Sequence, residues 1–394
     1  MHIALTAEQH AFRAEIRRYF DELVTPSRRE GLGFEDGQYR DGQVYLDVIR
    51  QIGRDGWLTM GWPAEFGGGG RCMVDQLIFG DAAAVAGVAI PYLTINTIGP
   101  TLMRHGTAAQ KMHFLPRIAA GELHFSVGYS EVDAGTDLAA LKTTAVRDEA
   151  AGGWRITGQK MWTSQAKYAD YIWLAARTDP ERPRHRGLSV FTVPTTAQGF
   201  SFNAINTVAG VRTAATYFDN VWVPDDALIG DLNGGWNLIT NQLNHERVAL
   251  FSSAVLVDHI EKTAQWAAST AGADGRPVIS QAVVQELLGR AHARTELLTL
   301  LNWKLAAHND DLTPGQASAI KVFASENALE VYRLLMEVVG PQSAVTAESP
   351  GAVLAGVLER YHRTNLVFTF GGGTNEIQRD MIALLDLGLP VAKR

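Results

Sequence analysis

Hydrophobic residues recur at helical spacing through the first third of the chain. Thr6 and Gln9 form a capping box, and an apolar stripe follows it: Phe12, Ile16, Tyr19 and Leu23. This pattern predicts a first amphipathic helix. Further helices are predicted between turns that contain Gly and Pro, over residues 44–53, 72–86 and 108–120. The first third is therefore predicted to be mostly helical.

From about His124 the pattern changes to short runs that are rich in β-branched and aromatic residues and bounded by turn residues. These runs lie at residues 125–129, 142–147, 154–157, 171–175, 188–193 and 216–224. Several strands at such spacing are typical of an antiparallel barrel or sandwich. The middle third is therefore predicted to be a β domain.

After a glycine-containing loop at residues 230–235 the spacing becomes helical again. Apolar residues fall on one continuous stripe at Trp236, Ile239, Leu243, Leu250, Ala254 and Val257. Three more long helical stretches follow at residues 281–308, 315–339 and 352–369. Four long helices with short connections predict an antiparallel four-helix bundle. The fold class is thus α+β, with an N-terminal helical domain at 1–122, a middle β domain at 123–232 and a C-terminal bundle at 233–394.

Composition and charge narrow the possible functions. The chain has 394 residues, more than one hydrophobic core usually organises, and its 35 basic and 42 acidic residues give a net charge of −7. Nucleic acid is therefore not an expected partner. The single cysteine, Cys72, cannot form an intrachain disulfide, which fits a cytoplasmic location. Charged residues interrupt residues 1–24, so a signal peptide is not expected, and no apolar run predicts a membrane span.

Common cofactor and metal motifs do not occur in the sequence. No Gly-x-Gly-x-x-Gly run opens a strand–helix unit, and no Gly-Lys-Ser/Thr phosphate loop is present, so binding of nicotinamide or ATP by those folds is unsupported. The 11 histidines are scattered and form no His-x-x-x-His pair. No metal site is predicted.

Glu246 is a carboxylate within an otherwise apolar helical stretch. A structural role would make it a surface acid or a partner of Arg247, but adjacent residues of a helix do not face one another. Gly372 lies in a run of three glycines, which is typical of a turn. The other polar candidates also have ordinary alternatives: turn formation for Ser130 and Thr136, and helix N-capping for Thr374, Asn375 and Glu376. Core packing is the alternative for Trp162.

Two segments of the chain together resemble acyl-CoA dehydrogenases. Residues 370–379 resemble a signature near the C-terminus of that family, whose more common form carries the catalytic Glu where this chain has Gly372. A smaller branch of the family carries its base earlier, in a Leu-x-x-Glu-Arg pattern that residues 243–247 fit. The resemblance implies that the base has moved to Glu246. Further motifs similar to those of the family extend the resemblance over nearly the whole chain, at residues 105–111, 129–137, 160–164 and 223–230.

The resemblance implies an FAD-dependent reaction on an acyl-CoA. Glu246 would remove the proton next to the thioester carbonyl, flavin N5 would receive the β hydride, and a trans-2-enoyl-CoA would result. The backbone N–H of Gly372 and a ribityl hydroxyl of FAD would bind the thioester oxygen. Electrons would leave through an electron-transferring flavoprotein. Metabolically, the resemblance points to β-oxidation of fatty acids or steroid side chains.

The same resemblance implies roles for the remaining site residues. On the cofactor side it places Tyr129, Ser130, Trp162, Thr163 and Ser164, with the Trp162 indole stacked on the isoalloxazine. It places the FAD phosphates at Thr374, Asn375 and Glu376. Arg276 would reach a pyrophosphate bound by a partner subunit. On the substrate side it places Thr136, Asn244 and Arg247.

One departure from the family pattern bears on the assembly. Many members have Arg-x-x-Phe-Gly at the start of the second bundle helix, whereas residues 276–280 read Arg-Pro-Val-Ile-Ser. This pattern resembles steroid-degrading dehydrogenases that pair two different subunits, so the chain is expected to form a homotetramer or an α2β2 heterotetramer. Two alternatives stay open: a flavin oxidase or hydroxylase on the same fold, and a non-catalytic subunit of a heteromeric dehydrogenase.

Overall fold

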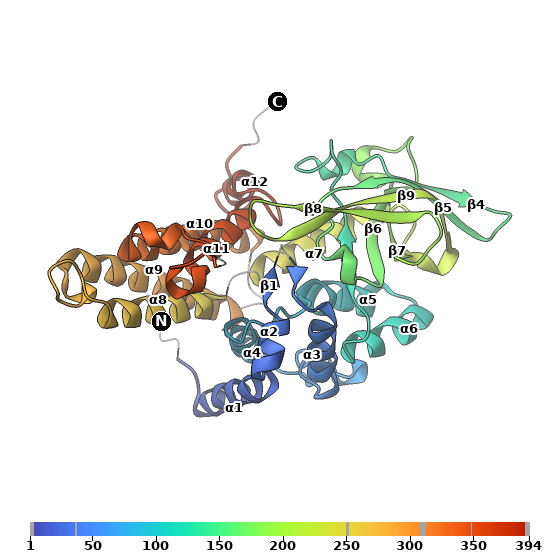
Figure 1. The fold of residues 1–394 in the computed structure, drawn as a ribbon. Helices are drawn as coiled ribbons and strands as arrows, with labels where there is room; N and C mark the ends of the chain where they lie inside the picture. Colours follow the sequence, from blue (N-terminus) through green and yellow to red (C-terminus); the bar gives the residue numbers. More distant parts are fainter. Residues whose placement is uncertain (1–3, 36–37, 250–251, 308–312, 348, 391–394) are drawn as a thin grey trace.

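The computed structural model describes residues 4–35, 38–249, 252–307, 313–347 and 349–390, and at 34–35, 38 and 243–249 it describes the backbone alone. N-terminal helices, a β-sheet and C-terminal helices follow one another along the chain and occupy separate regions of the molecule (Figure 1). The predicted order of helical, β and helical domains is confirmed. None of the helices in this part of the chain is long and apolar enough to cross a membrane.

The N-terminal region contains six α-helices within the described residues. They are α1 (Ala7–Leu23), α2 (Pro26–Gly31), α3 (Gly42–Arg54), α4 (Met73–Val85), α5 (Gly99–His105) and α6 (Ala108–Ala119). The predicted capping box is present, since the Gln9 N–H donates to Thr6 Oγ1 at 3.2 Å and the Thr6 N–H to Gln9 Oε1 at 3.0 Å. A short hairpin, β1 (Phe34–Glu35) and β2 (Gln38–Tyr39), and a π-helical segment, Leu93–Ile98, were not predicted.

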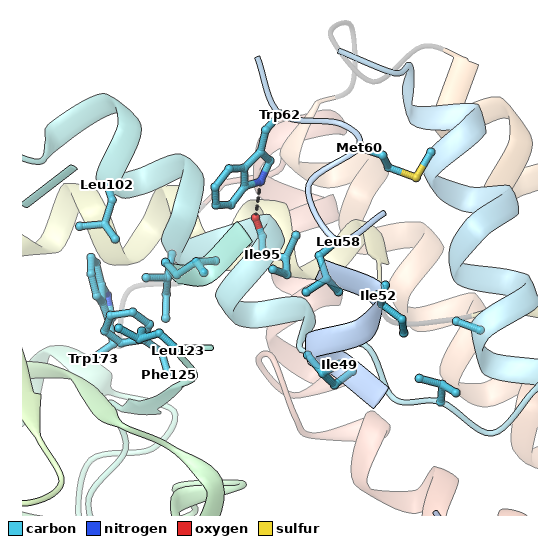
Figure 2. Packing of buried hydrophobic residues seen from close by; sticks show 14 of the residues in the cluster. Ile49, Ile52, Leu58, Met60, Trp62, Ile95, Leu102, Leu123, Phe125 and Trp173 are labelled. Carbon is cyan, nitrogen blue, oxygen red and sulfur yellow. Dashed lines mark hydrogen bonds between the residues drawn. The ribbon is translucent and has the colours of Figure 1, made fainter. Parts of the chain in front are cut away.

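The core of this helical region continues into the β domain. Ile49 and Ile52 of α3 and Leu102 of α5 belong to the same buried cluster as Phe125 and Trp173, which lie on strands (Figure 2). The Trp62 indole N–H donates to the Ile95 carbonyl at 2.9 Å, so this buried polar atom is satisfied. The two regions therefore share apolar surface, which fixes the sheet relative to the helices.

The β domain is one twisted sheet with the strand order β10-β7-β6-β4-β5-β9-β8, and β3 pairs with β6. Its strands are β3 (Phe125–Gly128), β4 (Thr144–Asp148), β5 (Gly153–Lys160), β6 (Tyr171–Arg177), β7 (Leu188–Pro194), β8 (Phe200–Asn206), β9 (Arg212–Pro224) and β10 (Leu228–Ile229). The pairing is largely antiparallel, as predicted, although β3 and β4 pair with β6 in parallel. Strand β8 was not predicted, because it is an edge strand whose side chains are mostly exposed and partly polar.

The C-terminal region is a bundle centred on α10 (Pro314–Val339). Helix α10 packs against its neighbours α7 (Gly235–Ala249), α8 (Ser253–Ser269), α9 (Ala282–Ala307), α11 (Val357–Asn365) and α12 (Asn375–Met381). Two expectations need correction. The continuous stripe predicted from Trp236 to Val257 is divided between α7 and α8, with Leu250 outside the described residues. The helix predicted at 352–369 is shorter, because Leu354 and Ala355 have φ of 50° and 52°, which a right-handed helix excludes.

Candidate active site

Trp162 lies just beyond the end of β5 and presents its indole to the outside. The backbone on either side is fixed, since the Met161 N–H donates to the Ser130 carbonyl at 2.8 Å and the Thr163 N–H to the Ala214 carbonyl at 2.9 Å. Trp162 itself has φ 64° and is 57% exposed. A bulky residue in the left-handed region is unfavourable, and such strain concentrates at functional sites. The structure thus holds an exposed aromatic ring at a fixed position.

The hydroxyls that follow Trp162 differ in how accessible they are. Thr163 is buried, and its Oγ1 lies 3.2 Å from Thr216 Oγ1 on β9. Ser164 lines the large cavity described below, and its carbonyl accepts a hydrogen bond from Ser126 Oγ at 2.8 Å. The Thr163 side chain is therefore engaged within the sheet, whereas Ser164 faces open space.

A buried ion pair joins this segment to the loop that carries Ser130. Lys160 is fully buried on β5, and its Nζ donates to Glu131 Oε1 at 2.8 Å and to the Tyr129 carbonyl at 3.0 Å. The Glu131 carboxylate also accepts from the backbone N–H groups of Lys142 and Thr143, at 2.6 and 2.9 Å. The loop at 129–131 is thus bonded both to β5 and to the start of β4.

Burial acts on the pKa values of the two partners in opposite directions. Burial lowers the pKa of Lys160 to about 8, although the Glu131 carboxylate acts to raise it. For Glu131, burial acts to raise the pKa, but the Lys160 charge and the hydrogen bonds it accepts bring the pKa below its ordinary value. No local pattern in the sequence predicts this pair, since a lysine within a strand is ordinarily a surface residue.

Tyr129 belongs to a second buried network, which joins three regions of the chain. Its hydroxyl bonds to Gln242 Oε1 on α7, and the Trp173 indole N–H of β6 donates to Tyr129 Oη at 3.2 Å and to Gln242 Oε1 at 3.1 Å. Gln242 Nε2 in turn donates to Thr101 Oγ1 of α5 at 3.2 Å. Helix α7 is therefore bonded to both the sheet and the N-terminal helices at Gln242, a contact that no local sequence pattern predicts.

The residues predicted on α7 are only partly described. Glu246, Asn244 and Arg247 lie in this helix, but their side chains are outside the described residues. Glu246 follows Gln242 by four residues, so the two positions lie on the same side of the helix. Of the two predicted residues in the sheet-side loop, Ser130 is half-buried and Thr136 is exposed.

The C-terminal glycine segment passes directly into α12. Gly372 and Gly373 have φ of 67° and 92°, which favours glycine at both positions. Thr374 caps α12, since its Oγ1 accepts from the Ile377 N–H at 3.2 Å. Asn375 is buried, with its side-chain amide bonded to Lys321, Ser325 and Glu326. Any contact of Asn375 with a phosphate would therefore come from its backbone.

Glu376 and Arg276 complete the predicted set. Glu376 is exposed, and hydrogen bonds from its own backbone N–H and from Thr374 lower the pKa of its carboxyl group. Arg276 lies in the turn between α8 and α9 and is paired with Asp274, through its Nε at 2.9 Å and a second guanidinium nitrogen at 2.8 Å. The charge of Arg276 is thus already balanced within the chain.

A cavity of about 960 Å³ lies between α4, the segment at residues 86–96, α8, α10 and α11, with Ser164 and Gln165 on its wall. The wall is mostly apolar, with polar groups such as His259, whose Nδ1 lies 2.8 Å from Tyr332 Oη. Burial lowers the pKa of His259 to about 4, so the ring is neutral at pH 7. The cavity fits a bulky, largely apolar ligand. Among the described residues, no cluster of His, Cys, Asp or Glu could hold a metal ion.

The fold, together with the loop at 129–131 and the C-terminal glycine segment, corresponds to one class of enzyme. Family models for the N-terminal, middle and C-terminal domains of acyl-CoA dehydrogenases match residues 6–122, 126–221 and 233–384. The chain therefore belongs to the acyl-CoA dehydrogenase family, whose members are oxidoreductases and generally FAD flavoproteins.

Individual members of that family are similar to the chain over its full length. It is 53% identical over 402 residues to acyl-CoA dehydrogenase FadE26 of Mycobacterium tuberculosis (strain ATCC 25618 / H37Rv), with 100% of both chains covered. Among solved structures it is similar to the ChsE4-ChsE5 complex from M. tuberculosis, with 53% identity and a TM-score of 0.93, and to the Tcur3481-Tcur3483 steroid ACAD, with 43% identity and a TM-score of 0.91. Both comparisons cover 100% of each chain.

Proposed function

We propose that this chain is the catalytic subunit of an FAD-dependent acyl-CoA dehydrogenase that forms a trans-2-enoyl-CoA, with Glu246 as the base. The observation that carries the proposal is the pairing of an acid at 246 with a glycine at 372. Glu246 lies on α7, and Gly372 shortly precedes α12. Both helices pack against α10, and we propose that the base on α7 reaches a thioester bound at the glycine segment.

The residues around Trp162 fit an FAD group. The exposed indole offers a flat stacking surface, and Ser164, two residues further on, lines the cavity. Gln378 Oε1, next to the glycine segment, is buried without a hydrogen-bond partner among the described residues, as expected where a bound group completes the bonding. Trp162, Ser164 and the loop backbone at Tyr129, Ser130 and Thr163 would hold the flavin, and residues 374–376 its phosphates. When bound, FAD would accept the β hydride and pass on the electrons.

The protein's own groups perform the proton transfer and polarise the substrate. Glu246 takes the proton from the carbon next to the thioester carbonyl. The Gly372 N–H, which donates no hydrogen bond within the described part of the chain, binds the thioester oxygen and stabilises the negative charge that develops there. Asn244, Arg247 and Thr136 orient the acyl-CoA. Placing Glu246 and the Gly372 N–H around one bound thioester supplies much of the rate enhancement, because the reacting atoms are already aligned.

The substrate that we propose is a bulky acyl-CoA, such as a steroid side-chain thioester. The cavity of about 960 Å³ lies at the upper end of the range for small-molecule sites, roughly 300–1,000 Å³, and among the described site residues Ser164 alone lines it. Gly372 adds no side chain beside the thioester, which leaves room for branching. One related structure is described as a steroid ACAD, which supports the same substrate class.

We also propose that the chain assembles with a related, different chain as an α2β2 heterotetramer that reduces an electron-transferring flavoprotein. One similar structure is described as the ChsE4-ChsE5 complex, and the other carries two chain names, Tcur3481-Tcur3483. Arg276 is paired with Asp274 in this chain, which leaves its charge less available for a partner's pyrophosphate. Large apolar side chains of the C-terminal segment are exposed and would be covered by a partner: Leu366, Phe370, Leu384, Leu385, Leu387 and Leu389.

An anaerobic titration tests this function. The chain is purified alone and with the related chain, the flavin absorbance per chain is measured, and acyl-CoAs from short chains to steroid side-chain thioesters are added. We expect flavin only in the complex and bleaching by the bulky thioesters. Bleaching by none of them would contradict the proposal. Oxygen consumption at turnover rates would indicate an oxidase, and bleaching that survives Glu246→Gln would indicate that this subunit is non-catalytic.

A further inference from the structure

The glycine segment 371–373 has no side chains with which to hold its own shape. Glycine loses more conformational freedom on folding than any other residue, so three in succession need external restraints to keep one conformation. The Gly371 N–H is fixed by the Val367 carbonyl at 2.7 Å. The carbonyls of Gly372 and Gly373 are both held by long polar side chains from helices beneath the segment.

Lys321 supplies one of these restraints. It lies within α10, is fully buried, and its Nζ donates to the Gly373 carbonyl and to Asn375 Oδ1, both at 2.8 Å. Asn375 is fixed in turn, because its Nδ2 donates to Ser325 Oγ at 3.0 Å and to Glu326 Oε1 at 3.2 Å. A buried ammonium group is costly unless its bonds are well placed, so this arrangement is not an ordinary packing contact.

Gln378 supplies the other restraint. It is fully buried on α12, and its Nε2 donates to the Gly372 carbonyl at 3.0 Å. A Cβ atom at position 373 would lie 2.7 Å from the same Nε2, so a side chain there would displace the Gln378 amide, and the φ of 92° also favours glycine. Restraints on two successive carbonyls fix the peptide planes on both sides of Gly373, and the first of these planes adjoins the peptide that carries the Gly372 N–H.

We propose that Lys321 and Gln378 are positioning residues that aim the Gly372 N–H at the thioester oxygen. The inference rests on the proposed function, in which that N–H stabilises the developing negative charge. Such a donor is effective only at hydrogen-bond distance from the oxygen, and a misplacement of about 1 Å can lower a rate about 100-fold. If the two side chains only stabilised the fold, their loss would leave the polarity of the bound carbonyl unchanged.

The test compares Lys321→Met and Gln378→Met in the flavin-loaded complex. Two properties are measured: the rate of anaerobic flavin reduction, and the carbonyl stretching frequency of a bound trans-2-enoyl-CoA by difference infrared spectroscopy. We expect reduction to slow about 30- to 100-fold at saturating substrate, with a smaller change in KM. The carbonyl frequency should return toward that of the free thioester. Lys111→Met on α6 is the control with the same chemical change, and it should alter neither property.

The possible results distinguish a failure of the positioning role from a failure of the proposed function. If wild-type protein reduces its flavin but both variants, folded and loaded with flavin, keep the wild-type carbonyl frequency, the positioning role is wrong. If Lys321→Met does not fold, Gln378→Met decides, because it removes an uncharged side chain. If no acyl-CoA reduces the wild-type flavin, the proposed function has failed and the inference fails with it.

Discussion

Two buried lysines hold the two loops of the proposed site, and they use different acceptors. Lys160 binds a carboxylate, Glu131, together with the Tyr129 carbonyl, whereas Lys321 binds the Gly373 carbonyl and the Asn375 amide oxygen. The sheet-side loop has side chains, so an ion pair can hold it. The glycine segment has none, so it is held through its backbone carbonyls. Both loops therefore depend on a buried ammonium group, which meets a carboxylate in the first loop and uncharged oxygens in the second.

Removing the cation from the sheet-side loop should have the largest effect on stability. Lys160→Met leaves the Glu131 carboxylate in the sheet without its partner, and breaking a buried ion pair in this way costs about 3–5 kcal/mol. We expect a lower midpoint of thermal unfolding, measured by differential scanning calorimetry, and loss of bound flavin, measured by its absorbance. The double variant Lys160→Met/Glu131→Gln is the control, and it should recover part of the stability. Equal midpoints for Lys160→Met and wild type would contradict the ion pair's role.

The same lysine should make the sheet-side loop sensitive to pH. Burial lowers the pKa of Lys160 from 10.5 to about 8, so the folded chain releases this proton first as the pH rises. Between pH 8 and 10.5 the unfolded chain binds more protons, so the contribution of Lys160 to the free energy of unfolding rises with pH. Flavin retention should fall over the same window, because the ion pair is lost.

The difference between wild type and Lys160→Met isolates this effect from other titrating groups. Unfolding and flavin retention are measured for both proteins from pH 7 to pH 10. A difference in unfolding free energy that does not change with pH would show that Lys160 is not the titrating group.

Trp162 should contribute to flavin affinity and little to stability. Its side chain is largely exposed, so Trp162→Ala should change the free energy of unfolding by about 0.5 kcal/mol or less. Loss of stacking should weaken FAD binding by about 0.5–1.5 kcal/mol, a few-fold to tenfold in Kd. Trp162→Phe should keep most of the affinity. Fluorescence titration of the apoprotein complex with FAD gives both values, and an unchanged Kd for Trp162→Ala would show that the indole does not contact the flavin.

The sequence predicted the parts of this site that depend on local pattern. The capping box at Thr6 and Gln9 and most helices and strands follow from periodicity over a few residues. The hydrogen bonds that hold the loops do not follow from local pattern, because Glu131 and Lys160 are 29 residues apart and Tyr129 and Gln242 are 113 residues apart. Such pairs become neighbours only when the sheet and helices pack together. Strand β8 was missed for a different reason, since an exposed edge strand needs no apolar alternation.

The most direct test of the central claim is the rate of anaerobic flavin reduction in Glu246→Gln, measured by stopped-flow absorbance in the complete complex. Glutamine keeps the size of the side chain but cannot accept the proton, so a flavin-loaded variant should be reduced at least about 10³-fold more slowly than wild type. Glu246→Asp, which keeps a shorter base, should fall between them. A Glu246→Gln protein that is reduced at the wild-type rate would show that the base lies elsewhere.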